Sequence, residues 1–162
     1  MAQFDLKNAT IKIYDGTTPT PNQLEIKIGE GSMNYVERRN IEYVLDRGLL
    51  DEVREGDQVP VDVNFDFTWV YLKASTGVTP TVEDAVKKRG EAAAWTSTDV
   101  DECRPYAVKI VVLLTPACGA DQNEEIVLTD FRYEELDHNL SDGTVSVSGK
   151  CNITEATVSR GV

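Results

Sequence analysis

Alternation of apolar and polar residues, the pattern of a half-buried β-strand, is most regular across residues 61–71. Valine or an aromatic residue occupies every second position: Val61, Val63, Phe65, Phe67, Trp69 and Tyr71. The intervening positions carry mostly polar side chains: Asp62, Asn64, Asp66 and Thr68. Successive side chains of a strand point to opposite faces. The pattern therefore predicts a strand with an apolar face in the core and a polar face turned away from it.

Similar patterns predict strands over most of the rest of the chain. They cover residues 4–14, 24–28, 106–114 and 126–133, with one or two closing strands within 144–157. Turn-forming residues cluster at 15–21 and 139–143, between predicted strands. The run at 106–114 is apolar at nearly every position, which is typical of a central strand covered on both faces.

One short helix is predicted near residues 80–90. Thr79 or Thr81 can cap its N-terminus, Pro80 suits the first turn, and Gly90 is a suitable terminator. About seven strands and one helix, with no visible repeat or linker, indicate a single domain over residues 1–162 of the all-β or β-dominated class. We expect a β-sandwich with one short flanking helix.

Composition narrows the classes of function. The chain carries 28 acidic and 16 basic residues, a net charge of −12, which argues against a surface that binds duplex nucleic acid. This charge keeps the protein soluble, and it is also compatible with a surface that repels nucleic acid. The N-terminus has no basic region and no apolar run, and no segment is long enough for a membrane helix. We therefore expect synthesis in the cytosol and no membrane partner.

No group of residues indicates catalysis. His138 lies in a polar turn, no Ser or Cys stands in a nucleophile motif, and a solvated turn residue is the better interpretation. Asp62 and Asp66 would lie about 13 Å apart on one strand face, too far to share a cation. The cysteines form no CxxC pair, so we expect free thiols rather than a zinc site with His138. We expect no enzyme activity, no cofactor and no metal.

A series of motifs spans residues 24–72. LEIKIGEG at 24–31 is followed by NYVERR at 34–39, DRGLLD at 46–51 and EGDQVP at 55–60, before the alternating strand. TPT at 79–81, CRPY at 103–106 and an apolar strand come next. This order of a strand, a long charged loop, a Gly-Asp turn and an aromatic-rich strand resembles the tail-tube, or major tail, proteins of long-tailed bacteriophages.

The resemblance implies a non-enzymatic β-sandwich subunit that forms rings of six copies, with inner sheets joined edge to edge around a channel. Rings would stack into a tube through long loops and terminal arms. The implied partners are other copies of the chain and tape-measure, tail-terminator and tail-tip proteins. Genomic DNA would pass through without specific binding. The protein would be located in the virion tail after synthesis in the bacterial host cytoplasm.

Two sets of candidate residues follow from this resemblance. If the strand at 61–71 belongs to the inner sheet, its polar face lines the channel together with that of the preceding strand: Asp62, Asn64, Asp66, Thr68, Glu25 and Lys27. If it belongs to the outer sheet, that face meets solvent. A long charged loop or hairpin at about 29–58 would make ring-to-ring contacts by complementary charge, through Arg38, Arg39, Asp46, Arg47 and Asp51.

Two other hypotheses stay open. The same sandwich would suit another virion or secretion component, such as a capsid decoration protein or the tube of a contractile secretion machine. A small carbohydrate-binding β-sandwich would present exposed aromatic residues. The aromatic residues at 65–71 instead share a face with Val61 and Val63, so we expect them in the core.

Overall fold

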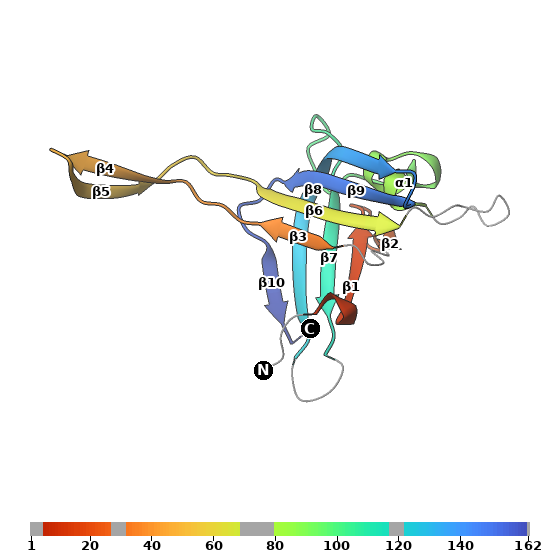
Figure 1. The fold of residues 1–162 in the computed structure, drawn as a ribbon. Coiled ribbons are helices and arrows are strands. Elements are labelled where there is room, and N and C mark those ends of the chain that lie inside the picture. Colours follow the sequence, from red (N-terminus) through yellow and green to blue (C-terminus); the bar gives the residue numbers. More distant parts are fainter. Residues whose placement is uncertain (1–4, 27–31, 69–79, 117–121, 162) are drawn as a thin grey trace.

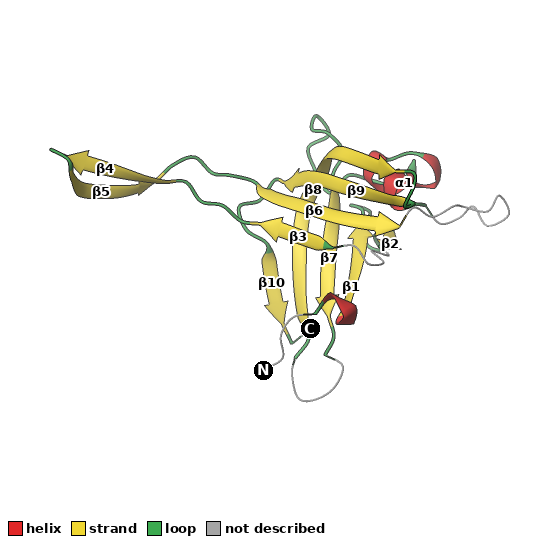
Figure 2. Ribbon diagram, in the orientation of Figure 1, coloured by secondary structure: helices red, strands yellow, loops and turns green. Residues whose placement is uncertain are grey.

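The computed structural model describes residues 5–26, 32–68, 80–116 and 122–161. Strands dominate it, which confirms the all-β class (Figures 1 and 2). The strands are β1 (Ala9–Tyr14), β2 (Gln23–Glu25), β3 (Met33–Val36), β4 (Ile41–Asp46), β5 (Leu49–Glu55), β6 (Val61–Thr68), β7 (Val108–Leu114), β8 (Glu124–Asn139), β9 (Thr144–Cys151) and β10 (Thr157–Arg160). The helices are η1 (Leu6–Asn8), α1 (Val82–Lys87) and η2 (Gly90–Ala92).

Eight strands form one antiparallel sheet in the order β2-β1-β7-β8-β9-β6-β3, with β10 also paired to β8. The sheet folds on itself along β8, whose first half pairs with β7 and β10 and whose second half pairs with β9. The bend coincides with a positive φ at Asp130 and with a register shift between Tyr133 and Glu135. Two layers result, and β6 and β9 cross over β1 and β7 at a steep angle (Figure 1). We call β2-β1-β7-β8-β10 the first layer and β8-β9-β6-β3 the second.

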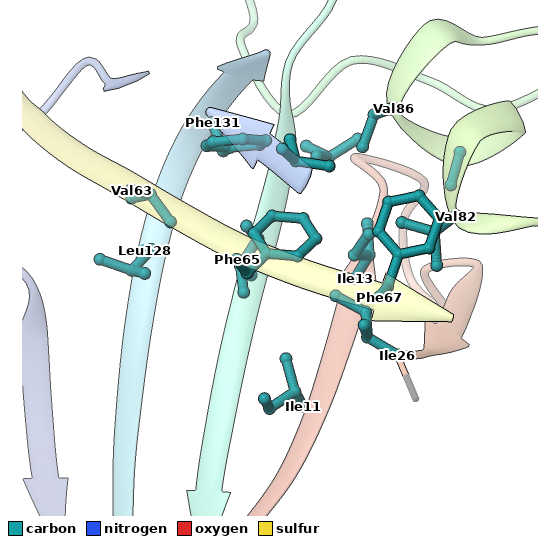
Figure 3. Close-up of a cluster of buried hydrophobic side chains, with 14 of the residues drawn as sticks. Ile11, Ile13, Ile26, Val63, Phe65, Phe67, Val82, Val86, Leu128 and Phe131 are labelled. Atoms are coloured by element: carbon teal, nitrogen blue, oxygen red, sulfur yellow. The ribbon is translucent and has the colours of Figure 1, made fainter. Parts of the chain in front are cut away.

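The core lies between these layers (Figure 3). The four core-facing residues of β6 are buried, from Val61 at 0% to Phe67 at 3% exposed, as the alternation predicts. Phe65 meets Phe131 of β8, with ring centroids 6.0 Å apart. Apolar side chains at every second position of the two crossing layers therefore fill the space between them. Trp69 and Tyr71, which the pattern places on the same strand, lie outside the described residues.

The predicted helix is confirmed and covers one end of the core. Thr81 is its N-cap: the Thr81 side chain accepts from the backbone of Asp84, and the Asp84 side chain accepts from the backbone of Thr81. Val82 and Val86 point from α1 into the core beside Phe67 (Figure 3). The helix ends at Lys87, and its C-cap is Lys88 in the left-handed conformation. Gly90, which the sequence suggested as the terminator, is instead the first residue of η2.

The turn after β1 is organised by one buried carboxylate. Asp15 is 3% exposed and accepts hydrogen bonds from Thr17, from both the backbone and the side chain of Asn22, and from the backbone of Thr96. Burial opposes ionisation of this group, but the hydrogen bonds outweigh it and lower the pKa of Asp15. The carboxylate thus ties the turn at 15–22 to the segment that follows η2.

Several element bounds differ from those predicted. In the described part of the segment predicted at 4–14, η1 precedes a strand that starts only at Ala9, and β8 continues well past residue 133 to Asn139. The charged segment at 32–58 contains three strands, β3, β4 and β5, of which the last two form a separate two-stranded sheet. The expected hairpin is therefore present, and part of the same segment belongs to the body.

Candidate functional site: a polar sheet face and a projecting arm

The second layer has a polar outer surface, which we call the polar face. It is built from cross-strand rows in which Asn64 of β6 lies between Asn34 of β3 and Ser148 of β9. The members are Asn34, Asp62, Asn64, Asp66, Thr68, Arg132, Glu135, Asp137, Asn139, Thr144, Ser146, Ser148 and Lys150. The middle of this face is a shallow hollow of about 190 Å³.

Charge is unevenly distributed along the polar face. The middle rows contain Asp66, Glu135 and Asp137, and the Ser146 hydroxyl donates to Asp66 at 2.7 Å. No basic side chain lines the hollow there among the described residues. At one end of the face Asp62 forms an ion pair with Arg38, and Lys150 lies opposite Asp62 across the strands. The face is therefore acidic in the middle and balanced at that end.

The structure brings together four of the six predicted channel residues. Asp62, Asn64, Asp66 and Thr68 share the polar face, on one strand. Glu25 is not with them: it lies on β2, at the far edge of the first layer, because β3 and β9 rather than β2 are the neighbours of β6. Lys27 lies outside the described residues.

Sequence reasoning missed the contributions of β8 and β9 to this face. The signal was present, since polar residues at 144, 146, 148 and 150 alternate with Val145, Val147 and Cys151 in the core. The local pattern does not show which strands pair, so it did not indicate that β9 lies beside β6.

The hairpin β4–β5, which we call the arm, projects away from both layers (Figure 1). Its two strands pair with each other and with no other described strand. Arg47 and Gly48 form the turn with positive φ values of 53° and 82°, as a tight two-residue hairpin turn requires. Most arm residues are exposed, and the exposed ones include large apolar side chains.

The two faces of the arm differ in chemistry. Cross-strand pairing and a register shift after Val44 place five apolar residues on one face, which we call the apolar stripe: Ile41, Tyr43, Leu45, Leu50 and Val53. The opposite face is mixed: it carries the charged residues Glu42, Asp46, Glu52 and Arg54 together with Val44 and Leu49. Arg54 Nε lies 3.7 Å from Glu42 Oε2. Tyr43, Leu45, Leu50 and Val53 are between 58% and 77% exposed. Four large apolar side chains thus lie side by side in solvent, without support from the body.

The predicted stacking residues separate into two places. Arg38 and Arg39 lie at the base of the arm, where Arg38 pairs with Asp62, and Arg39 Nε lies 3.6 Å from Glu55 Oε1. Asp46 and Arg47 lie at the tip, and Asp51 is in β5 beside the register shift. The base arginines are therefore engaged within the subunit, whereas the tip charges extend farthest from the body. The apolar stripe itself was not predicted.

Two ionic clusters hold the body together. Glu83 of α1 binds Lys87 and Arg89 at 2.8 Å each, and His138 Nε2 of β8 lies 3.3 Å from Glu83 Oε1. Burial raises the pKa of Glu83, but Lys87 and the other partners outweigh it and lower that pKa overall. His138 is thus a bridge between helix and sheet rather than a solvated turn residue. In the second cluster, Asp99 accepts from Arg132 at 2.7 Å.

Reactive groups are scarce in the described part of the chain. No three His, Cys, Asp or Glu side chains there are grouped to hold a metal ion. Cys103 is exposed and Cys151 is buried, both as free thiols, and burial raises the pKa of Cys151 to about 12. Cys118 lies outside the described residues. None of the described helices has the length and apolar character needed to cross a bilayer.

Comparisons with known proteins give little further assignment. No family model matches the chain, and no curated protein matches it. Among solved structures, a chain in the cryo-EM structure of the anti-feeding prophage baseplate, 6-fold symmetrised, aligns over 98% of this chain and 97% of its own length. The sequence identity is 9% and the TM-score is 0.42. At these values the likeness assigns neither a family nor a function to this chain.

Proposed function

We propose that this chain is a non-enzymatic structural subunit that assembles with copies of itself into stacked hexameric rings, forming a phage-type tail tube. The observation that carries the proposal is the arm, which exposes a continuous apolar stripe and receives no support from its own body. An isolated two-stranded hairpin is marginally stable in water, so an arm of this kind is best explained by a second molecule that covers it.

The free edges of the second layer support ring formation. β3 pairs only with β6 among the described strands, which leaves its other edge open. The second half of β8 likewise pairs only with β9. Exposed strand edges favour association unless they are covered, and closing a ring of identical subunits edge to edge pairs all of them. In such a ring the core side of each second layer stays covered by the first layer.

The polar face would then line the channel. Duplex DNA carries about one negative charge per 1.7 Å, so a basic lining would hold it, whereas an acidic lining lets it slide. Asp66, Glu135 and Asp137 would recur in every subunit of every ring. Small ions screen such a field only over about 8 Å at physiological salt, so the lining would repel DNA across a narrow bore.

Replacing the arm tests the assembly proposal directly. Gly56 N donates to Asn40 O at 2.8 Å, so the chain ends on either side of the arm are already adjacent. Residues 41–55 can be replaced by an Asn-Gly turn without disturbing the body. We expect the wild type to form rings or tubes in negative-stain micrographs at high concentration. The replacement should fold, as judged by circular dichroism, but form no tubes. A wild type that remains monomeric at millimolar concentration would refute the proposal.

A second experiment tests the channel lining alone. Cryo-EM of the assembled tubes locates the polar face relative to the bore. Glu135→Lys with Asp137→Lys should leave assembly intact, because both positions are exposed, and should make the tubes retain duplex DNA at low salt. A polar face on the outer surface of the tube would exclude the lining role and leave self-assembly standing.

A further inference from the structure

In the described part of the chain, an apolar opening leads to the core between β3 and the first layer. It is lined by Leu6, Met33, Tyr35, Val112 and Ile126, and we call it the mouth. Val158 of β10 lies opposite Ile126 across the strands, so its side chain faces the same way, and it is 45% exposed. The mouth thus extends along the core-facing side of the first layer where the second layer stops.

The mouth is large enough to receive side chains from another molecule. Its volume is about 310 Å³. A buried apolar cavity of about 150 Å³ is sufficient to hold benzene, so the mouth has room for two aliphatic side chains. Two carboxylates lie near it: burial raises the pKa of Tyr35, and Glu37 and Glu124 raise it further. Glu37 accepts a hydrogen bond from the backbone of Ala156 at 3.1 Å, and Glu124 lies 3.9 Å from Arg160 Nε, so a cation from another copy would join these contacts.

The tip of the arm matches the mouth in size and in charge. Leu45 and Leu50 lie opposite each other on the apolar stripe and are 58% and 77% exposed. Arg47 sits in the turn next to them and forms no ion pair within the described residues. The tip therefore presents two aliphatic side chains and one unpaired cation, and the mouth presents an apolar opening beside two carboxylates.

We propose that the arm tip of one copy inserts Leu45 and Leu50 into the mouth of a second copy, with Arg47 facing Glu37 and Glu124. This inference rests on the proposed self-assembly and names the two surfaces that carry it. The arm points away from its own body, so the contact is made between copies (Figure 1). A contact between two different surfaces of identical subunits is heterologous, and it continues from copy to copy until the assembly closes or ends.

Complementation between two defective variants tests this arrangement. Leu50→Asp impairs the arm, and Met33→Glu impairs the mouth at a partly exposed position; Leu6→Glu is a second mouth variant if the first fails to fold. Each variant alone should form nothing larger than a single ring, even at ten times the concentration at which the wild type assembles. A 1:1 mixture retains one intact arm and one intact mouth. It should give units stacked two deep and no deeper, by light scattering and microscopy.

The possible results separate the two proposals. A wild type that does not assemble refutes the proposed function itself. If the wild type assembles and the folded mouth variants assemble equally well, only the docking of the tip in the mouth is overturned. The same holds if the wild type assembles but the 1:1 mixture gives no units stacked two deep.

Photo-crosslinking locates the contact independently. A benzophenone amino acid in place of Leu50 should crosslink to peptides that contain Met33, Tyr35 or Leu6, and mixing labelled with unlabelled protein should show that the link joins two copies. The same group in place of Leu49, on the opposite face of the arm, should give at least fivefold less of this product. Links from position 50 to another arm or to the polar face would overturn the proposal.

Discussion

Replacing Leu50 with Ser should weaken assembly by roughly five- to thirtyfold while leaving the stability of the subunit almost unchanged. Leu50 is 77% exposed on the apolar stripe, so it contributes little packing to its own subunit. Surface substitutions of this kind usually change the free energy of unfolding by less than about 0.5 kcal/mol. The two effects should therefore separate cleanly.

The magnitude follows from the area that assembly would cover. Fully burying a leucine side chain stabilises by about 1.5–3 kcal/mol, so covering the exposed 77% of Leu50 contributes roughly 1–2 kcal/mol for each contact. A difference of about 1.4 kcal/mol is a factor of ten in an equilibrium constant. The concentration at which half of the protein is assembled should rise accordingly.

Sedimentation velocity across a concentration series measures the assembly, and urea unfolding measures the subunit. Leu49→Ser is the matched control, since Leu49 is 73% exposed at the neighbouring position but lies on the opposite face. We expect the control to assemble within about twofold of the wild type. If both variants weakened assembly equally, the apolar stripe would contribute no more to assembly than the opposite face of the arm. An unchanged midpoint for Leu50→Ser would mean that the stripe is not covered.

Three further predictions concern the subunit. Gly149→Ala should destabilise it by about 2–3 kcal/mol in urea, because a Cβ there would lie 2.2 Å from the carbonyl oxygen of Arg132; a change below 0.5 kcal/mol would mean that β8 yields at its bend. The pKa of Asp15 is lower in the folded protein than in the unfolded chain. Its contribution to the free energy of unfolding is therefore complete above the unfolded pKa of about 3.9 and is lost as the pH falls through the folded pKa. Asp15→Asn should flatten that acid loss in pH-dependent unfolding, and an unchanged slope would contradict the assignment. A thiol reagent at pH 8 should modify Cys103 in the folded protein and Cys151 only after unfolding, because Cys151 is buried and its pKa is raised to about 12; mass spectrometry of the labelled peptides distinguishes the two.

The sequence was sufficient wherever one strand or one helix determines the structure. The alternation over β6 predicted both its buried residues and its polar ones, because a period of two is a property of the strand itself. The helix at 82–87 was equally visible, since Thr81 and Asp84 form a cap within three residues. These features depend on neighbours in the chain and on little else.

What sequence reasoning missed depends on partners distant in the chain. Glu25 was grouped with Asp62 because their strands were taken as neighbours, whereas β3 and β9 flank β6 in the sheet. The apolar stripe was obscured by the register shift after Val44, which brings Leu50 rather than Asp51 opposite Leu45. Charged residues lie among the apolar ones around these positions, so composition alone favoured a loop or hairpin that acts through charge.

The connection of the arm to the body determines how the protein would carry a mechanical load. The arm is inserted between β3 and β6, and both strands run in line with it toward the body (Figure 1). Tension on the arm would therefore act along β6, parallel to the strand axis. The backbone hydrogen bonds to β9, over eight paired residues from Val61 to Thr68, would be loaded together in shear rather than broken one after another. An assembly joined through its arms would pull on each subunit in the direction in which its sheet is strongest.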